Sequence, residues 1–372
     1  MSTNQVDDDP ELLELMLTDG NAAPPLYRVT NYWEFLDRKL LPELRRMGLR
    51  DFRRRPQSAL ASFDATDRLP LPPHLNLFAC RLLNNRLTVR IDGYERLLER
   101  LSLAISRLLP LADSGYISVT GLGRIALDRA VDYGARMGAR PLADVGDSLL
   151  GNPEWVVERG ERAYTITFLK KYLNYAYCCR FLDFDAIATV VELGPGSGRQ
   201  VEVLKKLHPQ LTLYLFDIAP QLYVCEQYLK KVFGDKVVDY RRTRDLAALP
   251  KPDGRIYLFL NTKFPLLDGG KVDLFWNTAS FQEMEPVVVA NYLSFVNRAA
   301  DTAFIMACMG GKHVARAPGQ PGVLRATTFD DFATGLKDLE CVDRSFSVRP
   351  FGDEAIESPL NYENSFWRRR KR

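Results

Sequence analysis

The feature that most constrains this chain is a glycine-rich stretch near its middle, residues Val190–Gly198 (Val-Val-Glu-Leu-Gly-Pro-Gly-Ser-Gly). Apolar residues lead into an acid, and three glycines then follow at every second position. Residues 199–207 continue with a helical pattern of apolar side chains. Glycine permits backbone angles that other residues resist, and it lets a ligand approach the main chain closely. The stretch therefore predicts a strand, a tight turn and a helix, with a ligand site at the carboxyl end of a parallel strand.

From residue 188 onward, short apolar runs alternate with helical patterns. We expect strands at 189–193, 211–216, 255–260, 272–277, 302–306 and 341–348. We expect helices at 199–207, 220–233, 286–299 and 329–338. The apolar runs are rich in Val, Ile, Leu and Phe with little alternation, which is typical of strands buried on both faces. The alternation of strands and helices predicts an α/β fold with a Rossmann-like, doubly wound, mostly parallel sheet.

The residues before the glycine stretch have a different character. Residues 25–185 are mainly helical in pattern, and we expect them to form an extension or cap on a sheet domain at 186–350. The helical stripes of this region fall at 30–55, 94–109, 125–138 and 166–181. Residues 1–24, which are acidic, are expected to be a flexible tail, and residues 351–372, which end in a basic cluster, a C-terminal tail.

Composition excludes several classes of protein. The 372 residues carry 50 basic and 47 acidic side chains, and this balance gives no signal for nucleic-acid binding. The start does not have the pattern of a signal peptide, and no apolar run reaches the ~18 residues of a spanning helix. The six cysteines show neither a C-x-x-C pair nor a zinc spacing. We therefore expect a cytoplasmic protein without a metal site or a transmembrane segment. The oligomeric state stays open, a homo-oligomer included.

The spacing of the glycine turn narrows the choice of ligand. The turn does not fit G-x-x-x-x-G-K-[ST], which excludes a P-loop. The dinucleotide fingerprint G-x-G-x-x-G would need a third glycine at the position of Arg199. Asp217 follows the next expected strand, where a carboxylate can accept hydrogen bonds from both hydroxyls of a ribose. The pattern favours a ligand with a nucleoside.

The order Glu192-x-Gly194-x-Gly196-x-Gly198, followed by Asp217, resembles the class I S-adenosylmethionine-dependent methyltransferases. The resemblance implies S-adenosyl-L-methionine as cofactor. It places Glu192 near the methionine end, the three glycines beneath the ligand and Asp217 on the ribose. Contacts to the adenine would come from the end of the third strand, at Asn261.

A longer series of segments is similar to the sugar O-methyltransferase family. The series consists of Gly151–Pro153, Tyr164-Thr165 with Phe168-Leu169, Glu192–Gly198, Phe216–Tyr223 and Asn277–Met284. The similarity covers roughly residues 150–300. It implies a small-molecule acceptor, with a hydroxyl group of a sugar or a glycosylated compound receiving the methyl group.

The candidates for acceptor chemistry follow the fourth and fifth expected strands. A sugar hydroxyl is a poor nucleophile at neutral pH, so a general base should help. Glu283, after the fourth strand, and His313, after the fifth, are the candidate bases. Asn277 and Gln282 are the candidates to bind sugar hydroxyls.

Two alternatives remain beside a sugar acceptor. The first is a methyltransferase that acts on an oxygen or nitrogen of a non-sugar natural product. The second is a protein that binds the cofactor without catalysis, because folds of this kind also serve as binding modules. Asn277–Ser280 stands where enzymes that modify DNA bases carry an Asn/Asp-Pro-Pro-aromatic loop, which argues against a nucleic-acid substrate.

Overall fold

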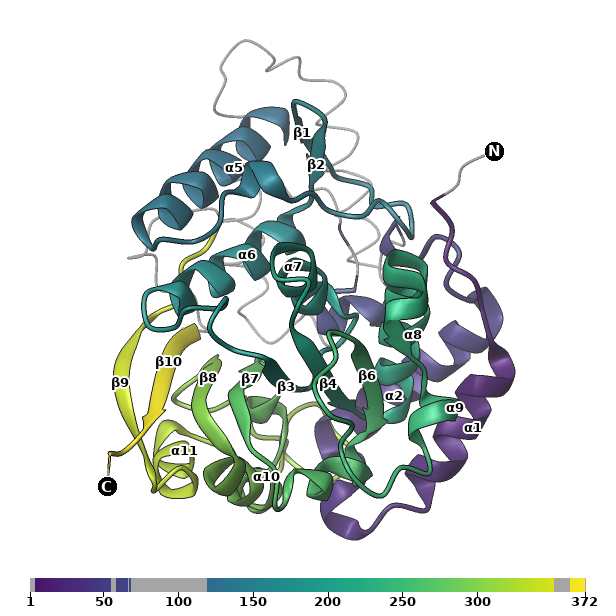
Figure 1. Cartoon of the computed structure of the whole chain (residues 1–372). Coiled ribbons are helices and arrows are strands. Elements are labelled where there is room, and N and C mark those ends of the chain that lie inside the picture. The colour runs from purple at the N-terminus through teal and green to yellow at the C-terminus, as the bar shows by residue number, and fades with distance from the viewer. Residues whose placement is uncertain (1–3, 55–57, 66, 68–118, 351–361, 372) are drawn as a thin grey trace.

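The centre of the computed structural model, which describes residues 4–54, 58–65, 67, 119–350 and 362–371, is a sheet of order β5-β6-β4-β3-β7-β8-β10-β9 (Figure 1). The strands span Val237–Val238 (β5), Ile256–Leu260 (β6), Thr212–Asp217 (β4), Thr189–Leu193 (β3), Val272–Thr278 (β7), Ala300–Cys308 (β8), Tyr362–Arg369 (β10) and Leu339–Phe346 (β9). The pairs from β5 to β8 are parallel, whereas β10 is antiparallel to both of its neighbours. The expected mostly parallel sheet is confirmed, and each predicted strand corresponds to one of these strands.

Helices cover both faces of the sheet, as a doubly wound fold requires (Figure 1). On one face lie α6 (Ile166–Cys179), α7 (Arg199–Leu207) and α8 (Ala219–Phe233). On the other lie α10 (Pro286–Ala299) and α11 (Phe329–Gly335), which pack against each other. The short helix α9 (Tyr240–Thr243) packs against β6. The four helices predicted in this half are confirmed, two of them with the same bounds.

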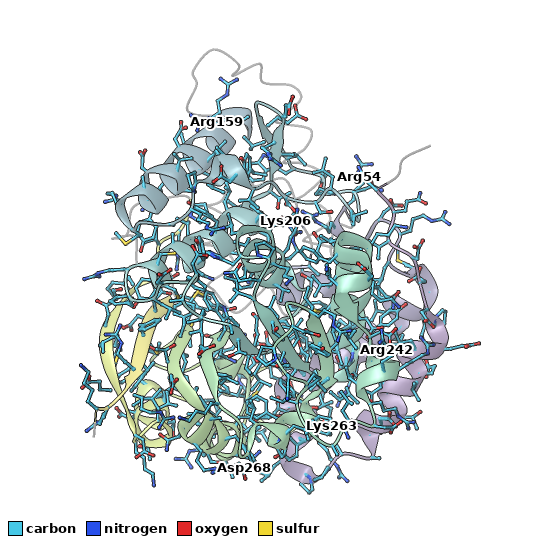
Figure 2. The ribbon with its side chains drawn as sticks, in the orientation of Figure 1. Arg54, Arg159, Lys206, Arg242, Lys263 and Asp268 are labelled. Carbon is cyan, nitrogen blue, oxygen red and sulfur yellow. The ribbon has the colours of Figure 1, made fainter. Side chains whose placement is uncertain are left out.

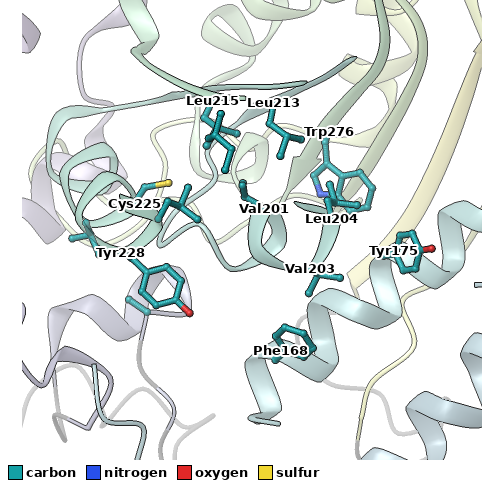
Figure 3. Close-up of a cluster of buried hydrophobic side chains, with 14 of the residues drawn as sticks. Phe168, Tyr175, Val201, Val203, Leu204, Leu213, Leu215, Cys225, Tyr228 and Trp276 are labelled. Carbon is teal, nitrogen blue, oxygen red and sulfur yellow. The ribbon is translucent and has the colours of Figure 1, made fainter. Parts of the chain in front are cut away.

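Buried apolar side chains join the sheet to the first of these helical layers. Figure 3 shows Phe168 of α6 and Leu204 of α7 in the same cluster as Leu213 of β4 and Trp276 of β7. Phe275, one residue before Trp276, belongs to the cluster on the other face of the sheet. Successive residues of β7 are thus buried on opposite faces, which explains why Leu274, Phe275 and Trp276 are apolar in succession.

The N-terminal region is mainly helical, as expected. It contains α2 (Asn31–Met47) and α5 (Val119–Arg136), a hairpin of β1 (Val157–Arg159) and β2 (Arg162–Tyr164), and short 3-10 turns. The turns span Pro25–Tyr27, Phe52–Arg54, Ala59–Phe63 and Leu142–Asp144. The helix expected at 94–109 lies outside the described residues. Leu40 and Leu44 of α2 belong to the same buried cluster as the sheet residues, so the cap and the sheet share one core.

Residues 4–24 are part of the fold, so the prediction of a flexible tail at 1–24 is wrong for the described residues. Pro10–Asn21 form α1, which packs against α8. Asp9 caps the helix by accepting a hydrogen bond from the Leu12 amide at 3.0 Å. Leu12, Leu13 and Met16 are buried. This apolar stripe supplies enough burial to hold the segment on the protein in spite of its acidic composition.

The C-terminal residues also form part of the fold. The prediction of a tail at 351–372 is wrong for Tyr362–Arg369, which form β10 between β8 and β9. Phe366 and Trp367 are buried on opposite faces of the sheet. The basic residues that follow predicted a tail, whereas this aromatic pair buries the strand on both of its faces. In the described part of the chain, no helix is both long and apolar enough to cross a membrane.

Candidate functional site

The glycine turn lies at the carboxyl end of β3, as predicted. Gly194, Gly196 and Gly198 have φ angles of 77°, 58° and 79°. These are left-handed values that favour glycine, so the spacing of the three glycines follows from the shape of the turn. The Gly194 amide donates a hydrogen bond to the Phe216 carbonyl of β4 at 2.8 Å, and Gly198 begins α7 as its N-cap. The turn is thereby fixed to two adjacent strands and one helix.

A segment of the N-terminal cap covers this turn. A Cβ atom placed on Gly196 would lie 3.1 Å from the carbonyl oxygen of Phe63. The Ser197 hydroxyl donates a hydrogen bond to the Asp64 carbonyl at 3.5 Å. The site is therefore bounded by the strand ends on one side and by residues more than a hundred positions earlier on the other.

Two of the predicted acids, Glu192 and Asp217, are buried at the ends of neighbouring strands. Burial raises the pKa of each carboxyl to about 8, and the Asp217 carboxylate adds to the shift of Glu192. The Gly196 and Ile218 amides donate hydrogen bonds to Asp217 at 3.1 and 2.8 Å. These bonds hold the Asp217 side chain across the glycine turn and offset part of its desolvation.

A third acid comes from the cap. Asp37 of α2 is 8% exposed, and its Oδ1 atom has no hydrogen-bond partner among the described residues. Burial raises its pKa to about 7. Asp37 also raises the pKa of Asp217, so the two carboxyls are close in space. A buried polar atom without a partner is uncommon in proteins, and here it belongs to a carboxyl next to the predicted ligand site.

Glu283, the first candidate base, lies among donors from the cap and from the loop after β8. Its side chain accepts hydrogen bonds from Trp33 Nε1 at 3.1 Å and from the Lys312 ammonium. Tyr32 makes a further hydrogen bond to this carboxylate, and the Lys312 ammonium lies 4.0 Å from the Tyr32 ring centroid. Burial nevertheless outweighs these donors and raises the pKa of Glu283. Glu283 is near Asp217, whose pKa it raises.

We refer to the four buried carboxyls at this edge of the sheet as the acidic cluster. Its members are Asp37, Glu192, Asp217 and Glu283. Asp37 and Glu283 raise the pKa of Asp217, Asp217 raises that of Glu192, and all four members have a raised pKa. Such a set of carboxyls is suited to a ligand that carries positive charge or several hydrogen-bond donors.

The two predicted substrate-binding residues have internal partners. Asn277 donates to the Leu193 carbonyl at 2.8 Å and accepts from the Phe281 amide at 3.1 Å. Gln282 accepts from the Cys308 amide at 2.6 Å and donates to the Tyr362 hydroxyl at 3.0 Å. Both side chains are fully buried. In the structure, they hold the loop after β7 against β3 and β8.

Asn261 and His313 occupy different environments. Asn261 lies directly after β6 and donates hydrogen bonds to the Tyr27 carbonyl at 2.7 Å and to the Tyr292 hydroxyl at 2.9 Å. It is buried at the same edge of the sheet as Asp217. His313 is exposed, and it is its neighbour Lys312 that reaches Glu283.

A cavity of about 450 Å³ opens at the same edge of the sheet. It is lined by Asp64, Lys170, Lys171, Asn174, Ala279, Met306, Ser347, Val348, Arg349, Pro350 and Tyr362. Ala279 directly follows β7, and Met306 lies near the end of β8. The Lys171 ammonium lowers the pKa of Glu192 against the effect of burial, so the cavity adjoins the acidic cluster.

A second set of buried charges also adjoins the glycine turn, and we refer to it as the paired cluster. It consists of Arg53, Asp67, Asp147, Arg199 and Glu202. Arg53 lies 2.7 Å from Asp67, and Arg199 lies 2.6 Å from Asp147. Burial opposes ionisation of Asp67, but the two guanidinium groups prevail and lower its pKa. At the outer end of this cluster, Lys206 donates a 2.7 Å hydrogen bond to Glu202 (Figure 2).

Sequence reasoning missed the residues that the cap contributes to the site. Asp37 carried a signal, because it falls on the apolar face of α2 between Trp33 and Leu40, at helical spacing. Lys312 and Phe63 carried none that distinguishes them from surface or core residues. In the described part of the chain, no group of three or more His, Cys, Asp or Glu side chains is arranged to hold a metal ion.

Comparison with known proteins gives distant structural similarities. No family model matches the chain, and no curated protein matches it. The structure of mitomycin 7-O-methyltransferase MmcR is 13% identical, with 97% of this chain and 99% of that chain covered and a TM-score of 0.35. Magnesium protoporphyrin IX methyltransferase (ChlM) from Synechocystis PCC 6803, with bound SAH, is 11% identical over 55% of this chain and 84% of that one, with a TM-score of 0.36.

The pyocyanin biosynthetic protein PhzM is a third example, at 12% identity and a TM-score of 0.35. The match covers 53% of this chain and spans only 55% of the length of PhzM. Similarity of this degree defines neither a reaction nor a ligand for this chain.

Proposed function

We propose that this chain is an S-adenosylmethionine-dependent methyltransferase that transfers a methyl group to a hydroxyl of a sugar or a glycosylated compound. The observation that carries the proposal is the pair of buried acids at the ends of β3 and β4, Glu192 and Asp217, on either side of the left-handed glycine turn. Open α/β sheets bind ligands at this edge. A P-loop or dinucleotide role does not fit the spacing of the glycines.

Each of the predicted cofactor-binding residues would contact a different part of the cofactor. Asp217 would accept hydrogen bonds from the ribose hydroxyls, and Glu192 would face the methionine end. Gly194, Gly196 and Gly198 would pass beneath the ligand, where a side chain would obstruct it. Asn261, at the end of β6, lies where contacts to the adenine are expected.

The charge of the acidic cluster supports the same cofactor. S-adenosylmethionine carries a sulfonium and an ammonium group, so it brings positive charge into the site. Burial disfavours the ionised forms of Asp37, Glu192 and Asp217 in the free protein. A cationic ligand would compensate these carboxylates, so Asp37 would also face the cofactor.

The bound cofactor would supply an activated methyl group with sulfur as the leaving group. The protein would align the acceptor hydroxyl with that group and keep water out. Glu283 is the base that the geometry supports, because it is buried near Asp217 and its pKa is raised. Lys312 and Trp33 would hold its carboxylate toward the acceptor. His313 is exposed on the neighbouring loop, so it is the less favourable candidate.

Calorimetric titration of S-adenosylmethionine tests the proposal. We expect binding to the wild-type protein, and binding weaker by about 10- to 100-fold for Asp217→Asn, because a charge-assisted hydrogen bond is removed. Asp235→Asn is the matched control, since Asp235 is an exposed acid beyond α8. Absence of binding to the wild type, or equal binding by Asp217→Asn, would refute the cofactor assignment.

Turnover is tested separately. Incubation with methyl-labelled S-adenosylmethionine and a panel of sugars and glycosides should transfer label to a hydroxyl, and Glu283→Gln should lower the rate by about 100-fold or more. A protein that binds the cofactor with unchanged affinity but methylates only a non-sugar acceptor would correct the substrate class and leave the methyltransferase proposal intact.

A further inference from the structure

We propose that the 450 Å³ cavity beside the acidic cluster binds a phosphate group of the acceptor, so that the substrate is a phosphorylated carbohydrate. This inference rests on the proposed function, and it adds the chemical class of the acceptor. The volume lies in the range of small-molecule sites, which usually measure about 300–1,000 Å³.

The position fits an acceptor site. Ala279, Met306 and Tyr362 line the cavity from the ends of β7 and β8 and the start of β10. These are the strand ends at which the glycine turn and the acids lie. Lys171, on the cavity wall, acts electrostatically on Glu192, the acid assigned to the methionine end of the cofactor. A ligand in this cavity would therefore lie on the side from which the methyl group is transferred.

The charge of the lining favours an anion. Among the described residues of the lining, Lys170, Lys171 and Arg349 are basic and Asp64 is acidic. Arginine and lysine are the side chains that proteins use to bind phosphate, the first through paired hydrogen bonds and the second as a point charge. The acidic cluster next to it has the opposite sign, so the two halves of the site would select ligands of opposite charge.

The two lysines are held in place. Asp64 lies 3.8 Å from the Lys170 ammonium and 3.5 Å from that of Lys171, and Lys170 above all lowers the pKa of Asp64. Asp64 has a φ angle of 56° at the end of a 3-10 turn, and its carbonyl accepts the Ser197 hydroxyl of the glycine turn. The cations are thus oriented by a residue that is itself attached to the cofactor turn, which couples the two parts of the site.

Neutral groups complete the lining. The Tyr362 hydroxyl accepts a hydrogen bond from Gln282, which leaves its own proton available to a ligand. Asn174 and Ser347 contribute an amide and a hydroxyl. A carbohydrate with a phosphate offers partners for both the cationic and the neutral groups.

Titration of inorganic phosphate into the full-length protein tests the inference. We expect binding to the wild type at low ionic strength, and binding weaker by about 10-fold for Lys171→Met, because one charge-assisted contact is lost. Lys171→Arg keeps the charge and should restore the affinity to within about 3-fold of the wild type. Lys251→Met is the matched control, since it removes one exposed positive charge at a position that is distant from Lys171 in the sequence.

Three results would overturn the inference. They are a wild type that does not bind phosphate, an equal loss for Lys251→Met and Lys171→Met, and displacement of phosphate by glucose as readily as by glucose 6-phosphate. The titration is run with and without saturating S-adenosylhomocysteine. Failure to bind S-adenosylmethionine and S-adenosylhomocysteine would refute the proposed function alone, while phosphate binding without cofactor still tests the cavity.

Discussion

The paired cluster and the acidic cluster both adjoin the glycine turn, both are buried, and they differ in charge balance. In the paired cluster, Arg53 and Arg199 face three carboxylates at ion-pair distance. In the acidic cluster, Lys312 is the cation among the described residues that forms a direct ion pair. Of the four carboxyls, it contacts only that of Glu283. The first cluster is compensated within the protein, and the second is left for a ligand to compensate.

The difference appears in the titration of individual acids. The guanidinium groups lower the pKa of Asp67 in spite of its burial, whereas at Asp147 burial outweighs them and raises the pKa. Burial raises the pKa of Asp37, Glu192 and Asp217 to between about 7 and about 8. Burial alone therefore does not separate a structural acid from a functional one. What separates them is whether the fold itself supplies the partner.

The largest expected effect comes from breaking the paired cluster. Arg199→Met removes the cation that lies 2.6 Å from Asp147 and 3.2 Å from Asp67. Removing one partner of a buried ion pair leaves an uncompensated charge, and we expect a loss of about 3–5 kcal/mol in the free energy of unfolding. Urea denaturation followed by circular dichroism measures it. A loss below about 1 kcal/mol would mean that the cluster is not compensated by Arg199.

The second effect comes from neutralising the acidic cluster. Asp37→Asn removes a buried charge that has no partner on Oδ1, so we expect the free protein to gain about 1–3 kcal/mol in stability at pH 8. The same change should weaken S-adenosylmethionine binding by about 10-fold, because a ligand contact is lost. Thermal unfolding and calorimetry measure the two effects.

Glu34→Gln is the control for Asp37→Asn, because Glu34 is an exposed acid on the same helix. Glu34→Gln should change neither the stability of the free protein nor its affinity for S-adenosylmethionine. A loss of stability in Asp37→Asn would show that Asp37 has a structural partner. Unchanged binding would show that it does not face the cofactor.

The sheet and the cofactor half of the site could be predicted because their signals are local. Glu192 and the three glycines lie within seven residues, and Asp217 ends the next strand. The strands from β3 to β8 are largely buried on both faces, so each contains a run of apolar residues with little alternation that stands out from its surroundings. Strand β10 was missed because its residues pair with β8 across a long stretch of intervening chain.

The contribution of the cap to both halves of the site depended on long-range contacts, which the sequence pattern does not encode. Asp37, near Asp217, and Trp33, which binds Glu283, reach the site from a helix that precedes β3 by about 150 residues. Asn277 had the right position and chemistry for a substrate contact, but its amide binds Leu193 and Phe281 in the structure. Spacing identifies which polar side chains lie near the strand ends, and only packing shows which of them the fold already uses.

A smaller effect is expected from pH. Asp217 has a folded-state pKa of about 8, above the value of about 4 in an unfolded chain, so the folded state holds the proton at higher pH. Its contribution to stability is present below pH 4 and is lost as pH rises toward 8. The free energy of unfolding should therefore fall from pH 6.5 to pH 8, by at most about 1.4 kcal/mol per pH unit for this group.

Comparison with Asp217→Asn identifies the contribution of this group, since burial also raises the pKa of Asp37 and Glu226 to about 7 and that of Glu192 to about 8. Urea denaturation at pH 6.5, 7.2 and 8.0 should give a steeper fall for the wild type than for the variant. Saturating S-adenosylmethionine should reduce the slope of the wild type, because the cationic ligand stabilises the ionised carboxylate. Parallel slopes for the two proteins would place Asp217 in contact with a cation of the protein.

The smallest expected effect on stability comes from an ion pair that lies outside both clusters. Arg159 forms an ion pair with Asp128 at 3.0 Å, with side chains that are 57% and 63% exposed, and it lies at the edge of the molecule (Figure 2). Water and salt screen such a pair, so Arg159→Met should change the free energy of unfolding by about 0–1 kcal/mol. It deletes the same charge as Arg199→Met, and the same urea denaturation measures both. If the two variants lost equal stability, burial would not be what gives the paired cluster its strength, and the distinction between compensated and uncompensated acids would lose its basis.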